Sequence, residues 1–258
     1  MNKNQIALQL YSVRDLAQQD MLGTLRRVGA VGYPAVEFAG YGGVPTAEIR
    51  ALLDSLGMKT AGVHVPLADL QSNPKQVFAD LYTLGCEYAV VPWVGEEYRG
   101  SDAGVQQLAS TLNDLGALCH AEGLQLAYHN HNFEFAAGEG PTMWDRLTAA
   151  TDPNLVALEL DIYWAAFAGA DPLALIDRYA SRLALLHLKD MTADATRAYA
   201  PVGTGTLPWP EILAAGAAAG VKWYVVEQDK SSDPLADTAL SLRNLEQLAT
   251  PGEGTSRG

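Results

Sequence analysis

The chain is poor in cysteine and in basic residues, and both shortages limit what it can be. Among its 258 residues only two are cysteines, Cys86 and Cys119. They fit neither a disulfide framework nor a CxxC metal motif, so we expect two reduced thiols packed near the core of a cytoplasmic protein. Seventeen lysines and arginines stand against thirty acidic residues, which gives a formal net charge of −13. That balance opposes binding to a phosphate backbone and disfavours a nucleic-acid partner.

Long apolar runs are also missing. No segment reaches the roughly 20 consecutive apolar residues of a membrane-spanning helix, so we expect no membrane association. The first residues, MNKNQIALQLYSVRD, reach Gln9 and Arg14 before an apolar run like that of a secretory signal develops. Hydrophobic residues still make up 48% of the chain, enough to bury a large core.

Short apolar runs, typical of buried strands, recur along the sequence. There are eight of them: QIALQL (5–10), AVEF (35–38), TAGVHV (60–65), YAVVPW (88–93), LQLAYH (124–129), LVALELD (155–161), LALLHL (183–188) and WYVVEQ (223–228). The segments between them have helical periodicity, and several end at a glycine, at positions 32, 57, 85, 123 and 220, as expected for left-handed helix caps.

Strand alternating with helix eight times, without a Pro/Ser-rich linker, predicts a single (β/α)8 TIM barrel. We expect the barrel over about residues 5–247, followed by a short tail, 248–258. A doubly wound open sheet also alternates strand and helix. It is the weaker alternative, because no glycine-rich dinucleotide fingerprint follows the first strand.

Ionisable residues lie at the C-terminal ends of these runs, where TIM barrels carry their active sites. Asp161, His187 and Glu227 end three consecutive predicted strands. A buried carboxylate is costly without a partner, and a divalent cation is a common one. With Glu134, from the loop after the fifth strand, these residues are predicted to bind one metal ion, Mn2+ first, with Mg2+, Co2+ or Zn2+ as substitutes. Each alone is more often a loop cap or a salt-bridge partner.

Five further residues are candidates for substrate binding: His64, His129, His131, Trp164 and Lys189. His129 and His131 share a strand face, as do His187 and Lys189, because side chains alternate along a strand. Lys189 is expected to stabilise an oxyanion, with a solvated loop lysine as the alternative. Structural histidines are the alternative for His129 and His131. Glu159, two residues before Asp161 on the same face, is expected to play a structural, hydrogen-bonded role.

Seven segments together resemble a known family: LQLYSVRD, GVHVP, YHNHNFEF, LDIYWAAFAGADP, HLKDM, PVGTGTLPW and VVEQD. They are similar to the sugar phosphate isomerase/epimerase group of xylose isomerase-like TIM barrels. The resemblance implies a divalent metal, often manganese, held by Glu, Asp, His and Glu, and Asp161, His187 and Glu227 match this pattern. Ketose epimerases carry the first Glu within strand five, where this chain has Tyr128 and His129. The later carboxylate, Glu134, resembles more closely the inosose dehydratases and enzymes that process 3-keto-sugars.

The predicted function is that of a metal-dependent isomerase or epimerase acting on a keto or aldehydo sugar through an enediolate. The metal would polarise the substrate carbonyl and make the adjacent C–H more acidic, with Glu134 and Glu227 as acid and base. A lyase or dehydratase of a 3-keto-sugar or inosose is the alternative from the same site. A non-catalytic sugar-binding barrel and a metal nuclease are further alternatives. The sequence leaves phosphorylation of the sugar and assembly into a homo-oligomer open.

Overall fold

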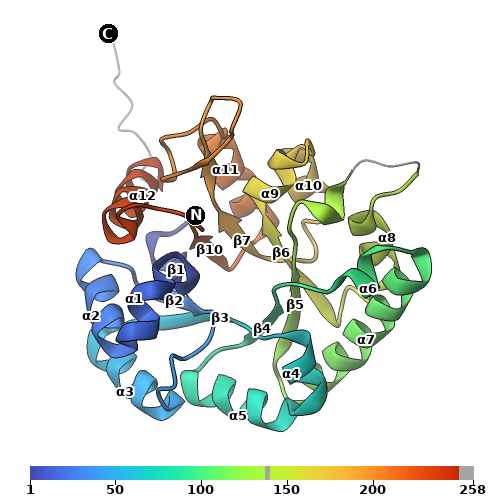
Figure 1. The fold of residues 1–258 in the computed structure, drawn as a ribbon, viewed down its shortest axis with the longest axis horizontal. Helices are drawn as coiled ribbons and strands as arrows, with labels where there is room; N and C mark the ends of the chain where they lie inside the picture. The colour runs from blue at the N-terminus through green and yellow to red at the C-terminus, as the bar shows by residue number, and fades with distance from the viewer. Residues whose placement is uncertain (137–139, 250–258) are drawn as a thin grey trace.

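The strands of this protein close into a barrel (Figure 1). The computed structural model describes residues 1–136 and 140–249. Its parallel strands pair in the closed order β1-β10-β7-β6-β5-β4-β3-β2. The barrel strands are β1 (Ile6–Gln9), β2 (Ala35–Phe38), β3 (Lys59–His64), β4 (Tyr88–Val91), β5 (Gln125–His129), β6 (Val156–Asp161), β7 (Leu183–Leu188) and β10 (Trp223–Val226). Each lies within one or two residues of a predicted run, and the predicted (β/α)8 barrel is confirmed.

Helices alternate with the strands and surround the barrel (Figure 1). The α-helices are α1 (Arg14–Gln19), α2 (Met21–Val31), α3 (Thr46–Leu56), α4 (Leu67–Ser72), α5 (Pro74–Leu84), α6 (Glu96–Arg99), α7 (Asp102–Ala121), α8 (Met143–Ala150), α9 (Ile162–Phe167), α10 (Pro172–Arg178), α11 (Trp209–Ala219) and α12 (Pro234–Ala249). Short 3-10 helices are η1 (Lys3–Gln5), η2 (Leu10–Val13) and η3 (Phe133–Phe135). Gly32, Gly57, Gly85 and Gly220 cap their helices in the left-handed conformation, as predicted.

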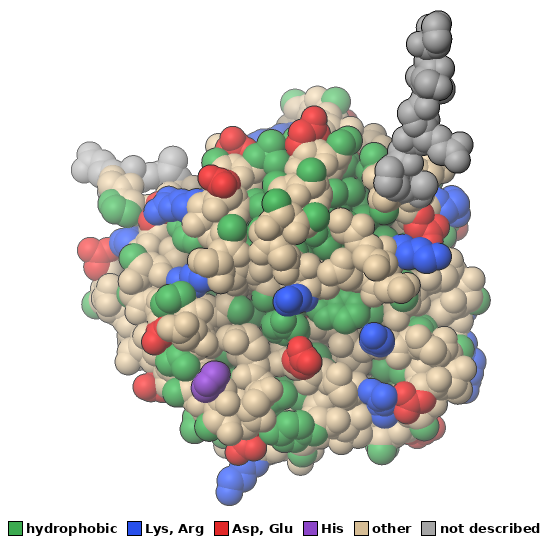
Figure 2. Space-filling view, turned by 180° about the vertical axis from the view of Figure 1, so that it is seen from behind, with side chains coloured by type: hydrophobic (Ala, Val, Ile, Leu, Met, Phe, Trp, Pro, Cys, Tyr) green, Lys and Arg blue, Asp and Glu red, His purple; other side chains and the backbone are tan. Residues whose placement is uncertain are grey.

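Within residues 1–136 and 140–249, no helix is long and apolar enough to cross a membrane. The face seen from behind carries acidic and basic side chains scattered among apolar and polar ones (Figure 2). Cys86 and Cys119 are free and buried, as expected. The last helix continues to Ala249, past the predicted barrel end, and residues 250–258 of the predicted tail lie outside the described residues.

Alternation along the strands sorts the barrel interior into two layers. One is apolar and consists mainly of small or branched side chains: Ala7, Ala35, Ala61, Val90, Ala127, Ala157, Leu185 and Val225. Two residues further along six of these strands, the side chains are polar and buried: Gln9, Glu37, His129, Glu159, His187 and Glu227. Because residues i and i+2 of a strand share a face, the polar layer lies above the apolar one, at the C-terminal end of the barrel. The strands thus present their ionisable side chains at one mouth.

The carboxylate of Asp190 holds the loop after β7 in place through several hydrogen bonds. Here β8 (Asp190–Met191) pairs with β9 (Tyr199–Ala200), a small antiparallel ribbon that the sequence did not predict. The buried Asp190 carboxylate accepts hydrogen bonds of 2.7–3.3 Å from the backbone N–H groups of Met191, Gly203, Gly205 and Leu207 and from the indole N–H of Trp209. A Cβ at Gly205 would lie 2.3 Å from Asp190 Oδ1, so the wrapped loop needs glycine there.

Candidate functional site

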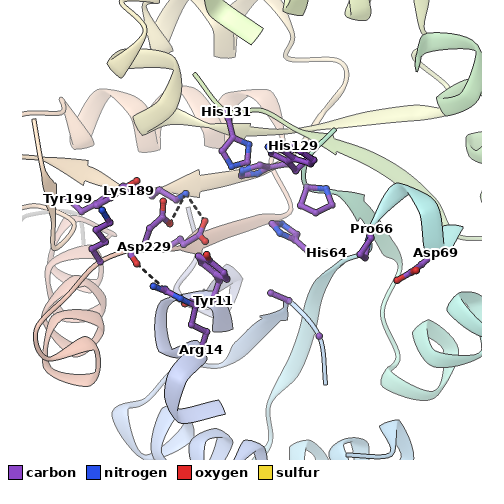
Figure 3. Close-up of a pocket in the computed structure, with 16 residues that line it drawn as sticks. Tyr11, Arg14, His64, Pro66, Asp69, His129, His131, Lys189, Tyr199 and Asp229 are labelled. Atoms are coloured by element: carbon purple, nitrogen blue, oxygen red, sulfur yellow. Dashed lines mark hydrogen bonds and ion pairs between the residues drawn. The ribbon is translucent and has the colours of Figure 1, made fainter. Parts of the chain in front are cut away.

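A cavity of about 640 Å³ opens at the C-terminal ends of the barrel strands (Figure 3). Its volume lies in the range of roughly 300–1,000 Å³ that is typical of small-molecule sites. Five of the predicted site residues line it: His64, His129, His131, Lys189 and Glu227. Tyr11 of η2, Arg14 at the start of α1 and Asp229 after β10 line it as well. The barrel therefore brings most of the predicted site to one place.

The ammonium group of Lys189 lies among three carboxylates in this cavity. Its Nζ is 2.9 Å from Asp161 Oδ2, 2.8 Å from Glu227 Oε2 and 3.1 Å from Asp229 Oδ1. The Lys189 side chain is only 2% exposed, so these are buried ion pairs. Lys189 is therefore not a solvated loop lysine. Asp229, which lies two positions after Glu227 in the loop that follows β10, was not among the predicted site residues.

His187 connects this cluster to a second group deeper in the barrel. Its Nδ1 lies 2.8 Å from Glu227 Oε2, on the side of Lys189. Its Nε2 lies 2.7 Å from Glu37 Oε2 and 3.2 Å from Glu159 Oε2. The two ring nitrogens thus face different sets of carboxylates.

Glu159 is the centre of the deeper group. Its Oε2 lies 2.8 Å from His64 Nε2 and 3.0 Å from His129 Nδ1, which is the hydrogen-bonded structural role expected of it. His64 and His129, the predicted substrate contacts, reach the cavity wall with one ring nitrogen engaged by Glu159. The free Nε2 of His129 lies 3.8 Å from Asp161 Oδ2.

Burial and close ion pairs set the charges of the imidazoles. Burial opposes a charge on His64, but the carboxylates of Glu37 and Glu159 outweigh it and raise the pKa of His64 to about 9. Burial also opposes a charge on His187, yet Glu159 and Glu37 raise its pKa well above the usual range. His129 behaves in the opposite way. Burial and the nearby charge of His187 hold the pKa of His129 well below its usual value, so this imidazole is neutral at pH 7.

The donor set at the mouth fits a divalent cation. Asp161 Oδ2 is buried and, within the described part of the chain, accepts no well-directed hydrogen bond, even from the nearby Lys189. Ligand atoms of Asp161, His187 and Glu227 all lie within 4.8 Å of one another. Carboxylate oxygens with one imidazole suit Mn2+ or Mg2+ better than a thiolate-seeking metal. Three of the four predicted ligands are thus brought together.

In a second group of residues, the possible ligand atoms also lie within 4.8 Å of one another, but this group fits a cation less well. It consists of His64, His129, Glu159 and His187. His64, which belongs to this group alone, holds a proton between Glu37 and Glu159, and a metal ligand must be deprotonated. The contacts of Glu159 Oε2 with these imidazoles are those of a hydrogen-bonded support beneath the first group.

Glu134, the fourth predicted ligand, lies apart from both groups. The turn η3 directs its side chain into the protein, where it is fully buried and does not line the cavity. Oε1 accepts a 2.8 Å hydrogen bond from the Tyr128 hydroxyl, and Oε2 accepts one of 2.8 Å from the backbone N–H of His131. Among the described residues, no group of close ligand atoms includes Glu134. Its contacts support the loop that carries His131 rather than a metal.

Glu134→Gln is expected to stabilise the protein as the pH rises. Burial raises the pKa of Glu134 from 4.5 to about 8, so its favourable contribution is complete below pH 4.5 and is lost as the pH approaches 8. Glutamine can accept from the backbone of His131 and donate to Tyr128 without ionising. We expect a gain of about 4 kcal/mol at pH 8 and less than about 0.5 kcal/mol at pH 4.5, measured by urea unfolding. An equal difference at both pH values would contradict this account.

Aromatic side chains flank the cavity. Tyr11 and Trp93 line it while 43% and 53% exposed. The guanidinium of Arg99 lies 4.4 Å from the Trp93 ring centroid and 3.5 Å from that of Phe133, which fixes one face of the indole. Trp164, a predicted substrate contact, is not among the lining residues. Its ring lies 5.7 Å from the Lys189 ammonium, so it packs against the site.

The barrel and its polar mouth define a TIM barrel of the kind that places an active site at the C-terminal strand ends. Residues 25–248 match the family described as xylose isomerase-like TIM barrel. The chain belongs to this family.

Individual relatives carry two kinds of name. An inosose dehydratase from Geobacillus kaustophilus is 30% identical over 192 residues, which cover 66% of this chain and 62% of that protein. The match therefore spans less than two thirds of the relative's length. A sugar phosphate isomerase/epimerase from Parabacteroides distasonis has a TM-score of 0.83 at 22% identity and covers 97% of this chain and 96% of its own. A second from the same organism has a TM-score of 0.78 at 26% identity and covers 94% and 97%.

Proposed function

We propose that this protein is a divalent-metal-dependent enzyme that moves a proton next to the carbonyl of a keto or aldehydo sugar, as an isomerase or epimerase. The observation that carries the proposal is the cluster in the cavity where Lys189 meets Asp161, Glu227 and Asp229 beside His187. Membership of the xylose isomerase-like family and the 26% identical sugar phosphate isomerase/epimerase support a sugar as substrate.

Asp161, His187 and Glu227 would hold the cation, for which Mn2+ is the first choice. His129 can supply the ligand that the sequence assigned to Glu134. Its imidazole is neutral, one ring nitrogen is fixed by Glu159, and the other lies 3.8 Å from Asp161 Oδ2. When bound, the cation supplies the Lewis acidity that polarises a substrate carbonyl.

The chain's own groups carry the proton transfer. Lys189 lines the cavity, and its ammonium stabilises the negative charge that develops on a substrate oxygen as the C–H proton leaves. Glu227, which contacts both Lys189 and His187, accepts that proton. Return of this proton to the neighbouring carbon, together with transfer of a hydroxyl proton between the two substrate oxygens, gives isomerisation. Epimerisation would need a second acid that delivers a proton to the opposite face of the sugar. His131 lines the same cavity, where burial and Lys189 lower its pKa to about 3, so it offers a neutral hydrogen-bonding group to a sugar hydroxyl.

Dehydration of an inosose or 3-keto-sugar is the second candidate, and Asp229 favours it. This carboxyl lines the cavity, and burial and the charge of Glu227 raise its pKa, so it can hold a proton for a leaving hydroxyl. The relative named inosose dehydratase points the same way. Mass spectrometry of the product separates the two reactions, because isomerisation conserves mass and dehydration removes one water.

Metal content of the untagged protein tests the proposal. We expect about one divalent ion per chain in the wild type and a loss of that ion in Asp161→Asn. The substitution is chosen because Asp161 Oδ1 caps α9 at 2.9 Å from the Trp164 N–H, and asparagine caps equally well. The group that is lost is then the charge on Oδ2, which lies 2.9 Å from Lys189 Nζ. Asp171→Asn, at the N-cap of α10 outside the site, is the matched control.

The reaction is then sought by incubating the metal-loaded protein with keto and aldehydo sugars in heavy water. Deuterium incorporation next to a carbonyl supports the proposal. If the wild type binds none of Mn2+, Mg2+, Co2+ and Zn2+, the strand-end cluster is purely structural and the proposal falls.

A further inference from the structure

His187 is held by two carboxylates from opposite sides, and only one of them belongs to the proposed metal site. Its Nδ1 faces Glu227 at 2.8 Å, and its Nε2 faces Glu37 at 2.7 Å. Glu37 is fully buried at the end of β2 and does not line the cavity. It therefore cannot touch a substrate in that cavity, and its contact with His187 needs another explanation.

We infer that Glu37 is a positioning residue that fixes the orientation and tautomer of His187 for metal binding. Because Nε2 donates to Glu37, the ring nitrogen that faces Glu227 is Nδ1, and Nδ1 would bind the metal once the cation displaces its proton. A carboxylate that holds the far nitrogen of a histidine ligand in this way orients the ring and strengthens metal binding. The inference rests on the proposed metal site and adds a residue that is not a ligand.

The surroundings of Glu37 are shaped to hold its carboxylate in place. The Gln9 side chain on β1 donates a 2.8 Å hydrogen bond to Oε2, the same oxygen that contacts His187. On the other side, a Cβ at Gly62 of β3 would lie 2.3 Å from Glu37 Oε1, so only glycine leaves room for it. The register between β2 and β3 shifts at this point, which places Gly62 opposite Glu37.

Glu159 is the second and more distant acceptor for His187 Nε2. It lies farther from His187 Nε2, at 3.2 Å against 2.7 Å for Glu37. Both oxygens have other partners. Glu159 Oε2 contacts His64 Nε2 at 2.8 Å and His129 Nδ1 at 3.0 Å. Glu37 Oε2 contacts Gln9 at 2.8 Å and His64 Nε2 at 3.2 Å. Glu37 is thus the closer acceptor for His187.

Two kinds of substitution separate the charge of Glu37 from its position. In Glu37→Gln, the amide oxygen can replace Oε2 and keep both hydrogen bonds, so only the charge is lost. In Gly62→Ala, the charge remains and the new methyl group displaces the carboxylate. Gly100→Ala, where a Cβ would meet only Glu96 O at 3.7 Å, is the matched control.

The measurement is Mn2+ affinity of the full chain by calorimetry, with melting temperatures as a check on folding. We expect Glu37→Gln and Gly62→Ala to weaken Mn2+ binding by about 10- to 100-fold, and Gly100→Ala to leave it unchanged. Histidine 15N–1H spectra of the Zn2+-loaded wild type should show His187 protonated at Nε2. In Gly62→Ala, this signal should broaden or shift.

The outcomes distinguish this inference from the proposed function. A wild type that binds no divalent ion overturns both. A wild type that binds Mn2+, with folded Glu37→Gln and Gly62→Ala variants that bind it equally tightly, leaves the metal site standing and overturns the role of Glu37. If Glu37→Gln does not fold, the charge-preserving Gly62→Ala variant decides alone.

Discussion

Replacement of Lys189 by methionine is expected to destabilise the metal-free protein by about 3–5 kcal/mol. Methionine fills a similar volume but leaves the buried Asp161 and Glu227 and the partly exposed Asp229 without the ammonium that lies 2.8–3.1 Å from each of them. Removing one member of a buried ion-pair cluster costs more than the pairs contribute, because the remaining charges stay out of water.

Urea unfolding of the metal-free protein at pH 7 measures the effect. Lys230→Met is the control, since Lys230 lines the same cavity but is exposed, and its loss should change stability by no more than about 0.5 kcal/mol. Added Mn2+ should stabilise the Lys189→Met variant more than the wild type, because the ion can neutralise the carboxylates that the lysine no longer meets. A variant as stable as the control without metal would show that these carboxylates do not need Lys189.

Glu227→Gln is expected to lower turnover by about 100- to 10,000-fold, the usual contribution of a positioned acid or base. Glutamine keeps an oxygen for the contacts with His187 Nδ1 and Lys189 Nζ, both at 2.8 Å in the wild type. It cannot accept the proton that the proposed reaction removes from the sugar, and it is a weaker metal ligand.

The test is the kcat and kcat/KM of the variant with the sugar identified by deuterium exchange. Glu96→Gln makes the same chemical change on exposed α6 and should retain wild-type turnover. Wild-type turnover in Glu227→Gln would remove this residue from the chemistry. A wild type that binds the sugar with no turnover at all would instead identify a sugar-binding barrel.

The barrel could be predicted because its signals are local. Each strand is a short apolar run, and several helices end at a glycine whose left-handed conformation the structure confirms, such as Gly57 and Gly85. The β8–β9 ribbon escaped prediction because strands of two residues carry no periodic pattern. It exists because the chain around Asp190 folds back on that carboxylate, a contact between residues 13 to 19 positions apart.

Site residues could be predicted from the sequence where they lie at the end of a strand, because the strand fixes the direction of their side chains. Asp161, His187 and Glu227 come together because strand ends meet at one mouth. Glu134 lies in a loop, and the direction of its side chain depends on the turn η3 and on the Tyr128 hydroxyl, neither of which the spacing reveals. The sequence did not reveal the ion-pair partners of Lys189 either. They come from β6 and from the loop after β10, and they approach the lysine only in the closed barrel.

The carboxylate of Asp190 bears on whether the sugar carries a phosphate. In many TIM barrels, backbone N–H groups in the loops after the last two strands bind a substrate phosphate. In this chain the N–H groups of Gly203, Gly205 and Leu207 already donate to Asp190. The N–H groups of this loop, which could otherwise bind a substrate phosphate, are thus already hydrogen-bonded to a carboxylate of the protein. These three N–H groups are therefore not available to bind a phosphate group.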